Sequence, residues 1–296
     1  MLAPREMTEM EWSKQLWPIL RWVLIVAAVY SLSIRLFENG AIYFPEPYPA
    51  TGWEPEKAGL LVEDCYFPTM DGVLLHAWYV PAKGDFTLLY LHGNAGNITN
   101  RLEPLLRLRT LPAGILIVDY RGYGRSQGKP SEAGLYLDAD AAYRYLTETK
   151  HAPPQRLILL GESLGTAVAV ELATRHPVAG LILEAPFPSA RDVARRSVPL
   201  PFAGFLIRTK FDSTARIASV NAPILMVHGE RDSTIPIDLG RKLFAAAREP
   251  KFFYALSQAD HNDISLVGGE AYSNRIREFL DFVRRHTKPP VEPMGG

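Results

Sequence analysis

From residue 59 onward, short apolar runs alternate with longer segments in which apolar residues recur at helical spacing. The apolar runs predict strands at 87–91, 115–119, 157–160, 181–183, 224–227 and 252–256. The longer segments predict helices at 98–111, 131–149 (with Ser131 as N-cap), 164–175, 237–247 and 270–284. Continuously apolar strands that alternate with helices indicate a parallel sheet buried on both faces. We therefore predict an α/β fold with a mostly parallel central sheet flanked by helices.

Two segments depart from this alternation. Residues 60–67 and 73–80 predict two strands joined at Asp71-Gly72, a dipeptide typical of hairpin turns. Residues 186–221 combine prolines with scattered apolar residues and fit no single regular element. We interpret this segment as a small lid over the edge of the sheet where ligands bind. The alternative is an ordinary long connection that contains one helix.

Near its N-terminus, the chain has an apolar segment. This segment reaches the length of a membrane span only if the arginines near its ends are included. Residues 22–34 carry no charge, and the segment extends to 16–37 if the arginines near its ends reach the lipid headgroups. We favour a helix within residues 1–44 that acts as a single-pass membrane anchor. The alternatives are a cleaved signal peptide, with Ser31-Leu32-Ser33 as a small-residue site, and an amphipathic or buried helix packed on the domain.

Basic residues flank this segment unequally. Arg5, Lys14 and Arg21 precede it, whereas Arg35 and Lys57 follow it. Since positive residues concentrate on the cytoplasmic side of a span, the count favours a cytoplasmic N-terminus and a main domain on the non-cytoplasmic side.

Proline content marks the boundary between the anchor and the main domain. Residues 45–58 contain four prolines, which disfavour both a helix and a central strand, so we predict a proline-rich linker. The main domain is then expected at 59–288, with the lid at about 186–221 and a C-terminal tail at 289–296.

Composition narrows the possible functions. The 32 basic and 32 acidic residues give a formal net charge of zero, which argues against a nucleic-acid-binding protein. The only cysteine, Cys65, lies in a strand-like stretch and is expected to be a small buried side chain. Histidines and cysteines do not cluster at the spacing of a metal site, so we expect no metal and no cofactor.

The segment Gly161-Glu162-Ser163-Leu164-Gly165 joins a predicted strand to a predicted helix. This G-x-S-x-G pattern is typical of a nucleophile elbow, a sharp turn that exposes a serine hydroxyl on strained backbone. Glycines on both sides avoid clashes at such a turn. The N–H groups that start the helix can stabilise developing negative charge. We predict Ser163 as the nucleophile and the Leu164 N–H as an oxyanion donor.

A serine nucleophile needs a base, and the base needs an orienting carboxylate. Where an elbow carries the serine, the expected chain order is serine, acid, histidine. Asp232 follows the strand at 224–227, and His261 follows the last strand, so both match this order. The nearby carboxylates Glu230 and Asp260 fit less well. We predict Ser163, Asp232 and His261 as a catalytic triad.

Two further contacts are expected around the nucleophile. The segment 91–97 follows an early apolar strand and is rich in small residues, so we assign the second oxyanion N–H to Asn94. Apolar lid residues would suit an acyl-chain pocket, or would equally serve ordinary lid packing. They are Phe187, Phe202, Phe205, Leu206 and Ile207, and Phe187 is our candidate substrate contact.

These motifs together resemble the α/β-hydrolase superfamily over about residues 60–287, and more narrowly its small-lid, membrane-anchored ABHD-type serine hydrolases. The matching segments are 92–97, 119–124, 161–165, 229–232 and 261–263. The resemblance implies the triad named above, and an N-terminal anchor is common in that branch. The chain departs from the pattern at Ala259-Asp260, where a glycine often precedes the histidine.

The expected activity is hydrolysis of a carboxylic ester or thioester through an acyl-serine intermediate. A membrane anchor would favour small-molecule acyl esters or lipids as substrates. One alternative is a serine peptidase of the same fold, because the same triad cleaves amides. A second is a non-catalytic, membrane-tethered binding protein, since fold alone does not guarantee activity. A third is an acyltransferase.

Overall fold

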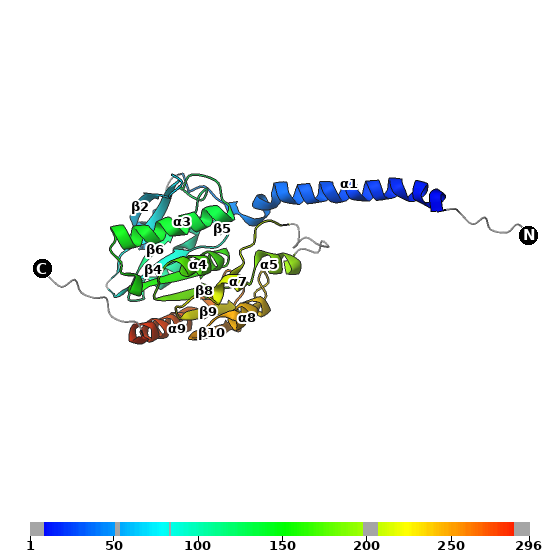
Figure 1. Cartoon of the computed structure of the whole chain (residues 1–296). Coiled ribbons are helices and arrows are strands. Elements are labelled where there is room, and N and C mark those ends of the chain that lie inside the picture. The colour runs from blue at the N-terminus through cyan, green and yellow to red at the C-terminus, as the bar shows by residue number, and fades with distance from the viewer. Residues whose placement is uncertain (1–8, 51–53, 83, 198–206, 287–296) are drawn as a thin grey trace, which may run out of the picture.

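The computed structural model describes residues 9–50, 54–82, 84–197 and 207–286 (Figure 1). Within these ranges, eight strands form the central sheet. They are β2 (Glu63–Pro68), β3 (Leu74–Val80), β4 (Phe86–Leu91), β6 (Ala113–Val118), β7 (Leu157–Glu162), β8 (Gly180–Glu184), β9 (Ile224–Gly229) and β10 (Lys251–Leu256). Their order is β10-β9-β8-β7-β4-β6-β3-β2. Only the β2–β3 and β3–β6 pairs of this sheet are antiparallel, which confirms a mostly parallel sheet.

Helices cover both faces of the sheet. One face carries α3 (Glu132–Arg144), α4 (Leu164–Arg175), α7 (Ser213–Ile217) and α8 (Ile237–Ala246), and the other carries α2 (Leu102–Leu108) and α9 (Ile264–His286). Strand β4 contributes to both cores, because Leu89 clusters with Val168 of α4 and Leu88 clusters with Phe279 of α9. Successive strand side chains point to opposite faces. A wholly apolar strand therefore supplies two cores, and the expected flanking of the sheet is confirmed.

Several helix boundaries differ from the sequence-based expectations for local reasons. The helix predicted at 98–111 divides into a 3-10 turn, Ile98–Arg101, and the shorter α2. Helix α3 starts after Ser131, whose hydroxyl caps it as predicted, but the chain continues as a π-helical turn over Tyr145–Thr149. Helix α9 starts earlier than predicted and is interrupted at Gly269, whose φ of 50° lies in the left-handed region that glycine tolerates.

The N-terminal helix α1 (Glu9–Ile42) extends away from the domain (Figure 1). Its stretch Leu16–Ile42 is long and apolar enough to cross a membrane, and none of its most apolar window is buried. Trp17 and Trp22, for example, are 67% and 66% exposed. The most apolar part of this stretch is therefore not buried on the domain. An uncovered apolar surface of this length is typical of a membrane contact or a protein contact.

The segment expected to be a linker makes ordered contacts with the domain. Strand β1 (Phe44–Pro45) pairs in parallel with β5 (Ala95–Gly96), and Pro47 forms an isolated bridge with Gly124. A short 3-10 helix follows at Pro55–Ala58. Proline lacks an N–H but keeps its carbonyl as an acceptor, so an edge contact of this kind remains possible where a central strand does not.

The described part of the expected lid contains α5 (Ala190–Ser197) and α7. Phe187 is buried, at 5% exposure, and Ile207 is half-buried. The other three apolar lid candidates (Phe202, Phe205 and Leu206) and the tail at 289–296 lie outside the described residues.

Candidate active site

A strained turn between β7 and α4 positions Ser163. Its backbone has φ 52° and ψ −114°, a conformation that is costly for a residue with a side chain. A Cβ at Gly165 would lie 1.9 Å from the Leu91 carbonyl oxygen, and a Cβ at Gly161 would lie 2.6 Å from the Gly165 carbonyl oxygen. Only glycine allows α4 to start this close to the strand ends, so the two glycines hold Ser163 at the carboxyl edge of the sheet.

The loops after β9 and β10 bring an acid and a histidine to the same edge. His261 Nε2 lies 3.0 Å from Ser163 Oγ, and His261 Nδ1 lies 2.8 Å from Asp232 Oδ2. The neighbouring carboxylate Asp260 instead accepts the backbone N–H of His261 and the hydroxyl of Ser233, and so fixes the loop. The three residues predicted as a triad thus stand in the geometry of nucleophile, base and orienting acid.

Asp232 is held in one orientation as an ionised carboxylate. Its Oδ1 accepts the N–H groups of Thr234 and Ile235 at 2.9 and 2.6 Å. His228 Nε2 lies 3.3 Å from Asp232 Oδ2 and donates to the Ile235 carbonyl at 2.8 Å. Burial alone would raise the pKa of Asp232, but hydrogen bonds from His228 and His261 hold that pKa well below its ordinary value. A carboxylate charge is therefore available beside His261 at neutral pH.

Two backbone N–H groups border the serine. Leu164 is the first residue of α4, and Asn94 lies on the loop after β4; both line the cavity that contains Ser163. Neither N–H has an acceptor within the described part of the chain. The first N–H groups of a helix have no partner inside it, which leaves that of Leu164 free to bind an anion. The structure thus places both predicted oxyanion residues in the cavity that contains Ser163.

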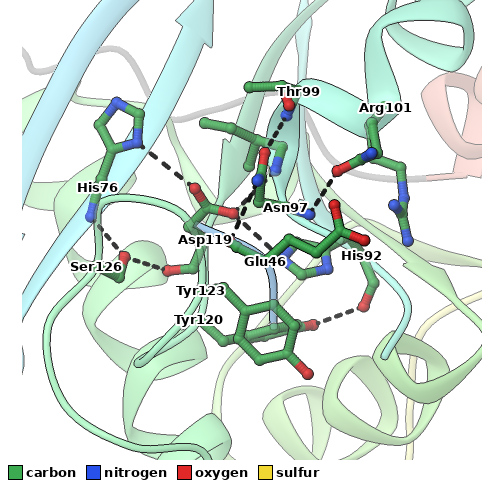
Figure 2. A network of polar contacts seen from close by, with 12 residues as sticks. Glu46, His76, His92, Asn97, Thr99, Arg101, Asp119, Tyr120, Tyr123 and Ser126 are labelled. Atoms are coloured by element: carbon green, nitrogen blue, oxygen red, sulfur yellow. Dashed lines mark hydrogen bonds and ion pairs between the residues drawn. The ribbon is translucent and has the colours of Figure 1, made fainter. Parts of the chain in front are cut away.

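A buried polar network supports the loop that carries Asn94 (Figure 2). At its centre, the Asp119 carboxylate lies 3.7 Å from His92 Nε2 and 3.6 Å from His76 Nδ1. Burial lowers the pKa of His92 to about 4, so its ring is neutral at physiological pH. The Tyr123 hydroxyl donates to the Asn94 carbonyl at 2.8 Å. The glycine-rich loop at 119–124 therefore packs against the loop that carries Asn94 and supports its conformation.

An apolar cavity of about 530 Å³ opens over Ser163, a size typical of small-ligand sites. Phe187 lines it, together with Val193 and Ala194 of α5. Its opposite wall belongs to the N-terminal helix and consists of Tyr30, Ser33, Ile34, Phe37, Glu38, Ala41 and Ile42. Sequence reasoning did not assign these α1 residues to the site. The one feature of the sequence that points to this wall is Glu38, a carboxylate near the end of an apolar helix.

A second pocket of about 400 Å³ is lined by His261 and by the charged residues Arg101, Glu162 and Glu184, among others. Arg101 Nε donates to Glu162 Oε2 at 2.9 Å, and the Tyr272 hydroxyl donates to the Glu184 carboxyl. Burial raises the pKa of Glu184 to about 7. This cluster leaves no local pattern in the sequence, because its members come from four separate elements.

Known proteins share both the sequence and the fold. A family model described as Alpha/beta hydrolase family matches residues 73–280. An uncharacterised Mycobacterium tuberculosis protein, Rv2307c, is 38% identical over 89% of this chain and 94% of its own. The Arabidopsis thaliana protein WAV2, named an alpha/beta hydrolase domain-containing protein, is 33% identical over 87% of this chain and 91% of its own. Protein bem46 of Schizosaccharomyces pombe is 30% identical over 87% of this chain and 93% of its own.

Among solved structures, the Pyrococcus furiosus esterase Pf2001 is similar in fold. It superposes with a TM-score of 0.68 at 20% identity, covering 81% of this chain and 97% of the esterase. Since the family model spans most of the folded domain and relatives above 30% identity cover nearly the whole chain, the chain belongs to the alpha/beta hydrolase family.

Proposed function

We propose that the chain is a serine hydrolase that cleaves carboxylic esters or thioesters with a long apolar acyl group. The observation that carries this proposal is the hydrogen-bonded chain from Ser163 through His261 to Asp232 at the floor of an apolar cavity. The carboxylate is ionised, the histidine reaches the hydroxyl, and the adjoining space accepts hydrocarbon. A peptidase would need polar groups for a peptide backbone, and the apolar lining favours an acyl chain instead.

The proposed reaction proceeds in two halves. His261 Nε2 accepts the Ser163 proton while Oγ bonds to the substrate carbonyl carbon, and the carbonyl electron pair moves to the oxygen. The Asn94 and Leu164 N–H groups donate to that oxyanion. Collapse breaks the bond to the alcohol or thiol, which leaves with the proton from His261. Water then attacks the acyl-serine by the same route and releases the acid.

Substrate preference tests this proposal. Full-length protein in detergent would be assayed with p-nitrophenyl esters of increasing acyl length and with aminoacyl p-nitroanilides. Each methylene that enters the cavity is expected to raise kcat/KM by about fourfold until the cavity is filled, from about 0.8 kcal/mol per buried methylene. Faster cleavage of the anilides would support the peptidase alternative. No turnover of either class, with no labelling of Ser163 by a fluorophosphonate, would support a non-catalytic binding protein.

We also propose that α1 is a single-pass membrane anchor, with the catalytic domain on the non-cytoplasmic side. The exposed apolar length of α1 supports the anchor, and the excess of basic residues before it supports the orientation. Cleavage after Ser33 as a signal peptide would remove Tyr30 and Ser33 from the α1 wall of the cavity over Ser163 and would leave the wall residues from Ile34 to Ile42.

A further inference from the structure

One face of the C-terminal part of α1 is turned toward the active site. The seven cavity-lining residues between Tyr30 and Ile42 recur at intervals of three and four, which places them on one side of a helix. They cover about 18 Å of helix length at 1.5 Å per residue. Leu32 and Leu36 lie between these residues in the sequence and do not line the cavity. The apolar segment therefore has two distinct faces at this end.

Hydrogen bonds fix this end of α1 to the lid. The Glu38 side chain is buried, at 6% exposure. Its carboxylate accepts the backbone N–H groups of Arg208 at 3.0 Å and Thr209 at 2.5 Å, residues that lie 170 positions further along the chain. A buried carboxylate held by two N–H donors is a specific attachment rather than a chance contact. It closes the cavity between α1 and the segment that contributes Ile207 and Phe211.

The same end of α1 is also fixed to the oxyanion loop. The Asn94 side-chain amide donates to the Ile42 carbonyl at 2.9 Å, and the Phe44 N–H donates to the Asn94 carbonyl at 2.9 Å. The pairing of β1 with β5 and the donation from Asn97 to the Glu46 carbonyl continue this contact (Figure 2). The residue proposed to donate to the oxyanion is therefore held on both sides by the chain that leaves the helix.

The position of the bilayer follows from the length of the helix. A hydrocarbon core of about 30 Å takes about 20 helical residues. Counted from Leu16, where the apolar stretch starts, this length ends near Arg35, whose charged group would then reach the headgroups. Tyr30 and Ile34 lie before that point, and Phe37 to Ile42 lie after it. The cavity thus extends along α1 across the membrane boundary and down to Ser163.

We propose that α1 forms one wall of the acyl-chain site, and that a membrane-resident acyl lipid enters this site directly from the bilayer along the Tyr30–Ile42 face. This inference rests on the proposed hydrolase function and names its substrate class. The lipid's chain stays in apolar surroundings from the bilayer to the cavity while its ester carbonyl reaches Ser163. The anchor is then a part of the binding site as well as a means of localisation.

The kinetic test compares two tryptophan substitutions on the same helix. Ile34→Trp fills the cavity from the α1 wall, and Leu36→Trp places the same bulk on the exposed face. Full-length variants in phosphatidylcholine vesicles would be assayed with p-nitrophenyl palmitate and p-nitrophenyl acetate. We expect Ile34→Trp to lower the palmitate-to-acetate ratio of kcat/KM by about tenfold or more, because a pocket discriminates one or two methylenes by at least this factor. Leu36→Trp is expected to leave the ratio within about twofold of wild type, because it lies outside the pocket.

A second variant guards against misfolding, and a binding measurement separates this inference from the proposed function. Val193→Trp fills the same cavity from α5 and should lower the ratio as Ile34→Trp does. Equal ratios for Ile34→Trp and Leu36→Trp, with both proteins folded by circular dichroism, would overturn the inference.

In the Ser163→Ala protein, a photoreactive fatty acid in the vesicles should crosslink to the cavity face of 30–42. Wild-type ester turnover with crosslinks confined to Leu32 and Leu36 would overturn the inference alone, whereas cavity crosslinks without Ser163-dependent turnover would overturn the hydrolase function.

Discussion

Replacing Asp232 by asparagine exchanges one carboxylate oxygen for an NH2 group at almost constant size. The N–H groups of Thr234 and Ile235 both donate to Oδ1, so the amide oxygen must stay there and the NH2 group must face His261. An NH2 group only donates, and it forces His261 Nδ1 to act as the acceptor. The ring proton of neutral His261 then lies on Nε2, facing Ser163 Oγ, and the ring cannot take the serine proton.

The expected loss has two sources. The carboxylate charge 2.8 Å from the imidazole nitrogen disappears, and a charge pair at about 4 Å is worth about 4 kcal/mol at an effective dielectric constant of 20. The wrong tautomer adds to this, and the same exchange in a serine protease triad costs about 10⁴-fold in kcat. We therefore expect Asp232→Asn to lower kcat by about 10³- to 10⁴-fold. KM should change little, because the Asp232 side chain is fully buried and does not line the cavity.

The assay is steady-state hydrolysis of p-nitrophenyl butyrate at neutral pH by full-length protein in detergent. Asp260→Asn is the matched control, since this carboxylate contacts the His261 backbone N–H and the Ser233 hydroxyl. It is expected to reduce kcat by less than about tenfold, through loop positioning alone. If Asp232→Asn kept more than roughly a tenth of wild-type kcat, or if Asp260→Asn were equally damaging, the assignment of Asp232 as the orienting acid would be wrong.

Three further predictions concern the elbow, a buried carboxyl and the orientation in the membrane. Gly165→Ala should destabilise the fold by about 1–3 kcal/mol or prevent folding, whereas Gly40→Ala, where a Cβ meets nothing within 4 Å, should not lower the thermal unfolding midpoint. The pKa of Glu184 in the folded chain, about 7, exceeds its ordinary value of 4.5. The free energy of unfolding should therefore fall as pH rises between these values, by up to about 3 kcal/mol. Glu184→Gln should flatten this pH dependence in thermal melting scans, and an unchanged slope would show that Glu184 is not its cause. Because Cys65 is buried, a membrane-impermeant maleimide should label the exposed variant Ala271→Cys on intact cells, and labelling only after lysis would reverse the proposed orientation.

The fold and the arrangement of the proposed triad residues could be predicted because their signals are local and sterically strict. Wholly apolar strands have one common solution, a sheet covered on both faces. The elbow requires glycine at both flanking positions, since each Cβ would overlap a carbonyl oxygen. Asp232 and His261 could be found because each follows a strand, and parallel strands deliver their following loops to the same edge.

The α1 wall of the cavity could not be predicted from the sequence. An apolar helical face has the same pattern whether it contacts lipid, a core or a pocket. Only the long-range contacts of Glu38 with Arg208 and Thr209, and of Asn94 with Ile42, distinguish these cases. The prolines at 45–58 also did not indicate the contacts of this segment with the domain. They exclude a central strand but not an edge pairing such as that of β1 with β5.

Covalent labelling identifies the nucleophile of a serine hydrolase without a substrate assay, and it should identify Ser163. Full-length protein treated with a fluorophosphonate would be digested and analysed by peptide mass spectrometry, with Ser163→Ala as the control. We predict one adduct, on Ser163, and neither an adduct nor measurable ester turnover in Ser163→Ala. An adduct on another residue, or wild-type turnover by Ser163→Ala, would show that Ser163 is not the nucleophile.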